Sequence, residues 1–279
     1  MTTKSILITG CSSGIGLAAA RTLRERGYRV FASCRKQADV ERLQREGFAD
    51  ALVLDLASSD SINEAVDEVL DKTSGQIFAL FNNGAYGLPG AVEDLPRAAL
   101  RRQFETNVFG THELTCRLLP ALLQQPDARI VQNSSVLGLV GMFNRGAYVA
   151  SKFALEGLTD TLRLELHGTP VKVVLIEPGP ILSDFRKNAL TTFQREIDVD
   201  GSRHQALYRA ALERLSKQGP AARFTLPASA VVDKLILALE KPRPRPRYYV
   251  TTPTYVMGSL KRLLPTRWLD GVIRRLGSA

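Results

Sequence analysis

Segments with the length of buried strands alternate with segments of helical periodicity along most of this chain. The alternation begins with a strand at 5–9, a helix at 15–26, a strand at 29–33, a helix that ends at Gly47 and a strand at 51–54. Because parallel strands need a crossover helix between them, this order predicts a parallel sheet. The apolar runs are nearly unbroken, which is typical of a sheet with helices on both faces. We therefore expect an α/β fold with a single doubly wound parallel sheet.

The same pattern continues toward the C-terminus and sets the expected domain organisation. A length of 279 residues suits one α/β domain with a short extension. Residues 183–225 are polar and weakly periodic, and we expect a helical flap there. We predict one domain at 1–252, which contains this flap, and an extension at 253–279. The other expected elements are a helix at 59–72, a strand at 77–81, a long helix at 96–123, a strand at 128–132, a helix at 148–166, a strand at 171–176, a helix at 227–240 and a closing strand at 248–251.

Composition excludes several classes of protein. With 44% hydrophobic and 23% charged residues, the chain is not collagen-like, coiled-coil or largely disordered. Its apolar runs are shorter than the roughly 18 residues of a spanning helix, and its start lacks a signal-peptide pattern. Scattered cysteines favour a reducing, cytoplasmic location, and no metal-ligand spacing is present, so we expect no metal site. The residues considered for metal binding are Cys11, Cys34, Cys116, His112, His167 and His204.

Positive charge is concentrated at the C-terminal end. The net charge is +9, and residues 241–279 hold nine Lys or Arg against one acid, Asp270. No nucleic-acid-binding module accompanies these cations, so a nucleic-acid partner is not expected. Apolar and basic residues interleave over 252–276, which predicts a pair of basic amphipathic helices broken at Pro265. Such a tail can lie on an anionic membrane surface, or it can pack its apolar face on the body or on a partner subunit.

A glycine-rich turn joins the first strand to the first helix. The segment Thr9–Gly16 places glycines and free N–H groups where a strand ends and a helix begins, an arrangement that binds a pyrophosphate. The residues expected to contact the cofactor there are Gly10, Ser12, Ser13, Gly14, Ile15 and Gly16.

The end of the second strand indicates which dinucleotide is bound. An NAD-binding chain usually has an acid at this point, but here Cys34 is followed by Arg35 and Lys36. A guanidinium group suits a ribose 2′-phosphate, so we infer NADP(H), with Arg35 as the principal contact and Ser13 as a second. Alternatively, Arg35 and Lys36 merely cap the solvated start of the following helix.

A tyrosine and a lysine are the first catalytic candidates. Tyr148 and Lys152 share one face of a predicted helix because they are four residues apart. Such pairs are common by chance, but Ser135 follows a strand end thirteen residues upstream and Asn107 lies in the preceding long helix. The alternatives are that Ser135 caps a strand end and that Asn107 is an ordinary polar helix residue.

Together these motifs resemble the short-chain dehydrogenase/reductase family from residue 4 to about residue 252. The run 148–157 is similar to the NADP-dependent hydroxysteroid and retinol dehydrogenase branch. This resemblance implies a Rossmann-like fold and a dinucleotide-binding and catalytic domain. It also implies a homodimer or homotetramer that associates through the helices at 96–123 and 147–166. The matching segments are 9–16, Asp55-Leu56, Asn82-Asn83, Asn107, Ser134-Ser135, 148–152 and Pro178-Gly179.

The resemblance also implies roles for individual residues. Tyr148 would exchange a proton with the substrate oxygen, its pKa lowered by Lys152 and by the oxidised nicotinamide. Ser135 would hold that oxygen, Lys152 would also bind the nicotinamide ribose, and Asn107 would keep its helix open around a water. The further cofactor contacts would be Asp55 and Leu56 at the adenine, Asn82 and Gly84 at the adenosine ribose, and Pro178, Gly179, Ile181 and Ser183 at the nicotinamide.

One segment departs from the family pattern. The family has Ala-Gly where this chain has Gly84-Ala85, so Ala85 would be strained if the family's glycine position requires a positive φ.

The apolar run 136–143 favours a hydrophobic aldehyde, ketone or alcohol, including steroid- or retinoid-like compounds, unless its side chains are simply core. Two other functions remain possible: a catalytically silent NADP(H)-binding sensor or scaffold, and a platform that presents the tail to a lipid surface.

Overall fold

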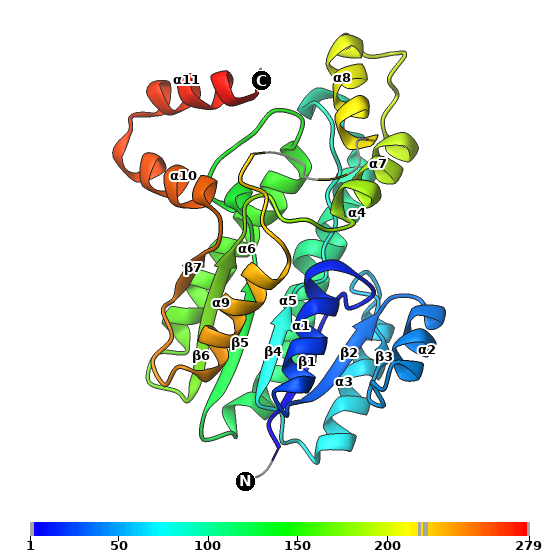
Figure 1. Cartoon of the computed structure of the whole chain (residues 1–279), viewed down its shortest axis with the longest axis vertical. Coiled ribbons are helices and arrows are strands. Elements are labelled where there is room, and N and C mark those ends of the chain that lie inside the picture. The colour runs from blue at the N-terminus through cyan, green and yellow to red at the C-terminus, as the bar shows by residue number, and fades with distance from the viewer. Residues whose placement is uncertain (1–2, 217–218, 220–222, 278–279) are drawn as a thin grey trace.

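Seven parallel strands form one sheet in the order β3-β2-β1-β4-β5-β6-β7 (Figure 1). The structure is a computed structural model that describes residues 3–216, 219 and 223–277. The expected doubly wound α/β fold is confirmed. The strands are β1 Ser5–Ile8, β2 Arg29–Cys34, β3 Leu52–Val53, β4 Ala79–Asn82, β5 Ala128–Asn133, β6 Val171–Glu177 and β7 Arg247–Tyr249.

Helices cover both faces of the sheet, as the unbroken apolar strands predict. One face is covered by α1 (Gly14–Glu25), α2 (Gln37–Arg45) and α9 (Ser229–Glu240), with α1 and α9 in front of the sheet in Figure 1. The other face is covered by α3 (Ser59–Thr73), α5 (Gly110–Leu123) and α6 (Gly146–Glu165).

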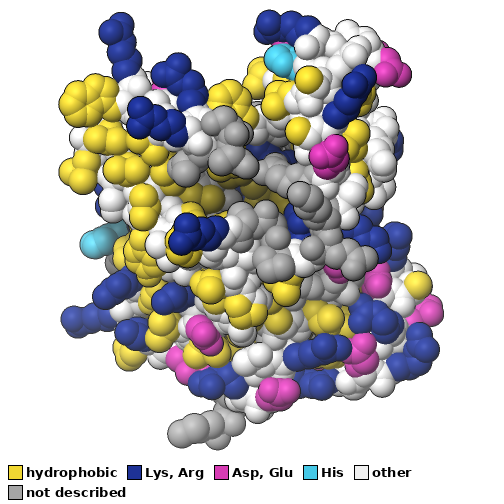
Figure 2. Space-filling view, turned by 45° about the horizontal axis from the view of Figure 1, so that its top comes forward, with side chains coloured by type: hydrophobic (Ala, Val, Ile, Leu, Met, Phe, Trp, Pro, Cys, Tyr) yellow, Lys and Arg dark blue, Asp and Glu magenta, His cyan; other side chains and the backbone are white. Residues whose placement is uncertain are grey.

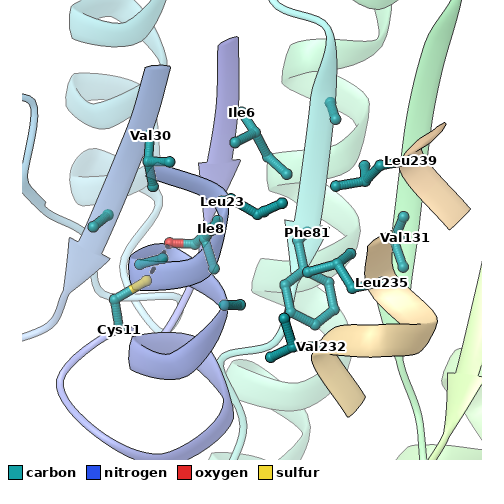
Figure 3. Close-up of a cluster of buried hydrophobic side chains, with 14 of the residues drawn as sticks. Ile6, Ile8, Cys11, Leu23, Val30, Phe81, Val131, Val232, Leu235 and Leu239 are labelled. Atoms are coloured by element: carbon teal, nitrogen blue, oxygen red, sulfur yellow. Dashed lines mark hydrogen bonds between the residues drawn. The ribbon is translucent and has the colours of Figure 1, made fainter. Parts of the chain in front are cut away.

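Alternation along the strands divides the core between the two faces. Ile6 and Ile8 of β1 point to the α1 and α9 side, where Leu23 of α1 and Leu235 of α9 pack against the sheet (Figure 3). Leu7 lies between them in sequence and packs on the opposite face. All five side chains are fully buried, which is worth about 1.5–3 kcal/mol each.

The long helix expected at 96–123 is interrupted at its centre. It consists of α4 (Arg97–Phe104), a π-helical turn (Glu105–Phe109) and α5. A π turn adds a residue to one helical turn, and such turns occur mostly at functional sites. The interruption contains Asn107, which is buried.

The flap and the tail lie at the carboxyl ends of the strands. Within 183–225 the structure contains two helices, α7 (Phe185–Glu196) and α8 (Gln205–Ser216), which are joined by the non-helical residues 197–204. The two ends of the flap are joined by hydrogen bonds from Leu182 N to Leu226 O and from Leu226 N to Pro180 O.

Two helices flank Pro265 in the tail, as the sequence predicts: α10 (Thr252–Leu263) and α11 (Thr266–Gly277). Part of their apolar face packs on Val136, Leu139 and Val140 of the body, which is one of the two arrangements expected. The described part of the chain has no helix of sufficient length and hydrophobicity to traverse a bilayer. The tail side chains in this contact are Met257, Leu260, Leu264, Leu269, Val272 and Ile273.

Candidate active site

The glycines of the turn Thr9–Gly16 occupy positions where a side chain would not fit or would be strained. Gly14 has φ +56°, in the left-handed region that favours glycine. A Cβ atom on Gly16 would lie 2.2 Å from the carbonyl oxygen of Gly10. The backbone of this turn is therefore open to close approach by a ligand, and α1 begins there with its free N–H groups.

Asn83 ties the glycine turn to the neighbouring strand ends. Its Nδ2 donates to the carbonyl oxygen of Thr9 at 2.9 Å, and its Oδ1 accepts from Nδ2 of Asn133 at 2.9 Å. The side chain of Asn82 points instead toward α5, where Nδ2 donates to Oγ1 of Thr115 at 2.9 Å. Only the backbone of Asn82 can thus face a cofactor in this arrangement. The bracing role of the Asn83 side chain was missed, because the sequence Asn82-Asn83 does not reveal which of the two side chains points toward the glycine turn.

The Gly84-Ala85 segment is not strained. Gly84 N donates to Thr9 Oγ1 at 2.7 Å, and a Cβ on Gly84 would approach Thr9 Oγ1 and Leu56 Cδ1 to 3.1 Å. Ala85 does not have a positive φ. The strain considered for this departure from the family pattern therefore does not arise.

The two cations that follow β2, near the expected position of the cofactor's adenosine, are exposed at the edge of the sheet. Arg35 and Lys36 are exposed between β2 and α2, and no ion pair among the described residues includes either of them. Arg42 of α2 donates to the carbonyl oxygen of Ser12 at 2.7 Å and so braces the glycine turn, a contact not foreseen from the sequence. Asp55 is partly exposed just after β3, and its Oδ1 accepts from Ala57 N at 2.9 Å.

The segment after β6 runs from the catalytic turn to the glycine turn. The carbonyl oxygen of Pro178 accepts from Val136 N at 2.8 Å. A Cβ on Gly179 would lie 2.1 Å from Thr251 Oγ1, so only glycine fits there. At the far end of the segment, Ser183 lies beside Gly14, since a Cβ on Gly14 would be 3.1 Å from Ser183 Cβ.

The four catalytic candidates converge at the carboxyl edge of β4 and β5. Nζ of Lys152 donates to the carbonyl oxygen of Asn133 at 2.7 Å and lies 5.7 Å from the ring centroid of Tyr148. Ser135 follows β5, and its hydroxyl accepts from Leu137 N at 3.1 Å.

Asn107 is the fourth candidate and is anchored at both ends of its amide. Its Nδ2 donates to Tyr86 O at 2.9 Å and to Ser151 Oγ at 3.1 Å, and its Oδ1 accepts from Tyr86 N at 3.2 Å. The π turn is thereby joined to α6 and to the segment after β4.

Burial is the main influence on the pKa values of Tyr148 and Lys152. It raises the pKa of Tyr148 to about 12, although a hydrogen bond with Ser135 opposes the shift. It lowers the pKa of Lys152 to about 8, opposed by the negative charge of Glu156. In the groups of this chain, desolvation of the phenol outweighs the hydrogen bond with Ser135 and the positive charge of Arg145. The lowering expected from Lys152 together with an oxidised nicotinamide stays a prediction.

Phe185 covers the tyrosine from the flap. The rings of Tyr148 and Phe185 stand edge to face, with their centroids 5.3 Å apart. Across the site, a Cβ on Gly87 would lie 2.7 Å from Cζ of Phe185. Phe185, the first residue of α7, thus forms a wall of the site. The sequence indicated this only through the position of Phe185 in the expected flap.

A buried ionic cluster lies one helical turn beyond Lys152. Arg247 of β7 donates to Glu156, to Glu177 and, at 2.6 Å, to Asp160 Oδ2. Burial, followed by the charge of Glu156, raises the pKa of Glu177 to about 8. The cluster connects β7, β6 and the catalytic helix α6.

Comparison with known proteins places the chain in a family. The family model of the short chain dehydrogenases matches residues 4–193. YbbO, an uncharacterized oxidoreductase of Escherichia coli strain K12, is 45% identical over 271 residues, which are 97% of this chain and 94% of that protein. The NADPH-dependent 3-dehydrocapnine reductase of Ornithobacterium rhinotracheale is 32% identical over 95% of this chain and 94% of its own length.

A solved structure agrees with these relatives. The short chain dehydrogenase/reductase of Burkholderia phymatum in complex with NAD is 25% identical, with a TM-score of 0.77 over 94% of this chain and 92% of that chain. Its fold extends over nearly the whole of both proteins, and the glycine turn and the Tyr148–Lys152 helix described above carry the family's motifs. The chain is an oxidoreductase that belongs to the short-chain dehydrogenase/reductase family.

Proposed function

We propose that this protein is an NADP(H)-dependent oxidoreductase that transfers a hydride between the nicotinamide and a hydrophobic carbonyl or alcohol substrate. The observation that carries the proposal is the convergence of Tyr148, Ser135 and Lys152 beside the glycine turn, where open α/β sheets bind their ligands. The bound cofactor supplies the hydride. The side-chain-free backbone at Gly14 and Gly16 fits a pyrophosphate.

The choice of NADP(H) rests on Arg35. This residue is exposed and has no acid beside it at the end of β2, so its guanidinium group is free to hold a 2′-phosphate. The NADPH-dependent relative supports this choice. The solved relative in complex with NAD supports dinucleotide binding in general.

Each catalytic candidate has a task that suits its surroundings. With its pKa raised to about 12, Tyr148 keeps its proton at neutral pH and can donate it to a carbonyl oxygen as the hydride is transferred. Ser135 holds the same oxygen through its hydroxyl. Lys152 presents a positive charge beneath the phenol and binds the nicotinamide ribose. Asn107 holds the π turn open for a water.

The apolar run after Ser135 divides into core and pocket wall. Leu137 and Val140 are buried, whereas Met142 and Phe143 are 41% and 48% exposed. Together with Phe185 over Tyr148, these exposed side chains favour a hydrophobic aldehyde, ketone or alcohol, including steroid- or retinoid-like compounds.

A panel assay tests the proposal against the silent-sensor alternative. Oxidation of NADPH and of NADH is followed with aldehydes, ketones, steroids and retinals, and NADPH binding is measured in parallel. The proposal expects turnover that prefers NADPH. Tight NADPH binding without turnover of any compound would favour a sensor or scaffold instead.

We also propose association of two copies or four through α5 and α6. Phe109, at the end of the π turn before α5, and Phe153, Leu158 and Leu164 of α6 are 41–73% exposed. Light scattering coupled to gel filtration is expected to give a dimer or tetramer, and Leu158→Glu is expected to give a smaller species. A monomer in the parent protein would contradict this.

A peripheral contact with an anionic membrane surface is proposed for the outer side of the tail. Leu263 and Trp268 are 78% and 69% exposed there, among several Lys and Arg side chains. Pelleting with anionic vesicles is expected to weaken in Leu263→Ser/Trp268→Ser. Equal pelleting of parent and variant would remove the lipid contact from the account.

A further inference from the structure

An open cleft of about 1010 Å³ separates the tail from the flap. Its walls are α11 with the end of α10, the segment 140–146, the 3₁₀ turn Val92–Asp94 and the start of α8. Figure 2 shows a hollow between the part of the surface formed by the tail and the part formed by the flap helices. The segment 140–146 connects the turn of Ser135 to the helix of Tyr148, so a molecule in the cleft lies beside the loop between two catalytic candidates.

The inner walls of the cleft are apolar and come from several elements. Val92, Phe143, Met142 and Leu207 line it and remain 74%, 48%, 41% and 38% exposed. Exposed apolar side chains that face one another across a hollow are a mark of a binding site. The apolar lining is completed by Val140, Leu264, Leu269 and Ile273.

Positive charge borders the cleft on the tail side. Lys261, Arg267 and Arg274 line it beside one acid, Asp270, and are exposed. None of the three belongs to an ion pair among the described residues, and Arg274 Nε donates to the carbonyl oxygen of Asp270 at 3.4 Å. Across the cleft the situation differs, because Arg203 and His204 are both paired with Glu93. The cations of the tail are therefore available for a ligand.

We propose that the cleft binds the far end of the substrate and that this substrate is a long-chain amphiphile, with a reactive carbonyl at one end of an alkyl chain and an anionic group at the other. The chain contacts the apolar walls, and a carboxylate, phosphate or sulfonate meets Lys261, Arg267 and Arg274. This inference rests on the proposed function for the reactive end and on the cleft for the remainder.

Binding is tested without catalysis through Trp268, the single tryptophan of the chain, which lies in α11 between two cleft residues. Fluorescence titration of the full chain with dodecanoate is expected to give a Kd about 10-fold lower than with dodecanol. Lys261→Gln/Arg267→Gln/Arg274→Gln is expected to abolish this difference. Arg243→Gln, an exposed cation outside the cleft, serves as the control and is expected to keep it. Equal Kd values for the two probes in the parent protein would overturn the proposal.

Turnover supplies the second test. The ratio of kcat/KM for an ω-carboxylated decanal to that for decanal is expected to be about 10 in the parent and to fall to about 1 in the triple variant, through KM. A ratio that survives in the triple variant would overturn the proposal. Decanal turnover without any preference for the carboxylate would leave the proposed function intact and reject the cleft. Selective dodecanoate binding without turnover of either aldehyde would show an anion-binding cleft that does not serve these substrates and would overturn the proposal, while the panel assay decides separately whether the proposed function stands.

A membrane headgroup is the other source of the same anionic chemistry. If the triple variant loses binding to anionic vesicles but keeps selective dodecanoate binding, the cations serve the membrane surface and the proposal fails. If it loses dodecanoate selectivity while Leu263→Ser/Trp268→Ser retains the ω-carboxylate preference in turnover, the free amphiphile is the ligand.

Discussion

The ring of Phe185 stands at 64° to the ring of Tyr148, with 5.3 Å between the two centroids. Phe185 begins α7, the first helix of the flap, whereas Tyr148 belongs to the first turn of α6. The contact keeps the phenol only 9% exposed, although it lies at an open edge of the sheet. The flap therefore covers part of the proposed proton donor.

Removal of this ring is expected to weaken substrate binding. Phe185→Ala takes away an apolar wall next to Tyr148, and kcat/KM for an apolar aldehyde should fall about 10-fold, mainly through KM. Steady-state kinetics with NADPH measure the effect. Leu182→Ala, at a 52% exposed position in the same segment, is the control and should change kcat/KM little. The same loss in both variants would deny Phe185 a specific role.

The activity is expected to decline in alkaline solution because of Lys152. Burial lowers its pKa to about 8, so it loses its proton as the pH rises through that value, and the charge beneath Tyr148 disappears. The negative charge of Glu156 opposes the shift, so Glu156→Gln should lower the pKa of Lys152 further and move the decline to lower pH.

The pH profile of kcat/KM measures this displacement. Asp160→Asn is the matched control, because it also replaces a carboxylate of the Arg247 cluster by an amide. Superimposable profiles for the parent, Glu156→Gln and Asp160→Asn would show that Glu156 does not act on Lys152.

Loss of the cation in the buried cluster should be costly. Arg247→Met leaves Glu156 and Glu177 without their shared cation, and Glu177 is fully buried. A buried polar group that loses its partner costs about 1–3 kcal/mol, and the free energy of unfolding in urea should decrease by about this amount. Arg247→Met/Glu177→Gln should recover part of the loss. A decrease below about 1 kcal/mol in the single variant would mean that the cluster is not important for stability.

Arg35 is expected to determine the preference between the two dinucleotides. Arg35→Ala should raise the Kd of NADPH by about 10- to 100-fold and leave the Kd of NADH nearly unchanged, since only NADPH carries the 2′-phosphate. Lys36→Ala removes the same charge from the next residue and should have a smaller effect. Equal weakening of NADPH and NADH in Arg35→Ala would favour the helix-cap alternative.

The features that could be predicted from the sequence are those specified by neighbouring residues. Strand alternation assigns Ile6 and Ile8 to one face of the sheet and Leu7 to the other, and the expected sheet follows from it. Tyr148 and Lys152 share a helix face for a similarly local reason. The glycine turn could be predicted because Gly14 and Gly16 satisfy backbone constraints that no other residue meets.

The features that could not be predicted depend on contacts between distant residues or on small backbone changes. Arg247 and Glu156 are separated by 91 positions, and nothing in either segment indicates the other. The π turn around Asn107 is a change of one residue in one helical turn, and the sequence predicts one continuous helix there. The raised pKa of Tyr148 results from burial in the assembled site, which outweighs the hydrogen bond with Ser135 and the charge of Arg145.

The most direct test of the account is the effect of Tyr148→Phe on kcat, with the Kd of NADPH measured on the same preparation. If the Tyr148 phenol is the proton donor, kcat with the best carbonyl substrate falls at least about 100-fold while the Kd of NADPH stays within about 3-fold of the parent value. If kcat instead remains within a few-fold of the parent, Tyr148 is not the general acid and the proposed catalytic arrangement is wrong.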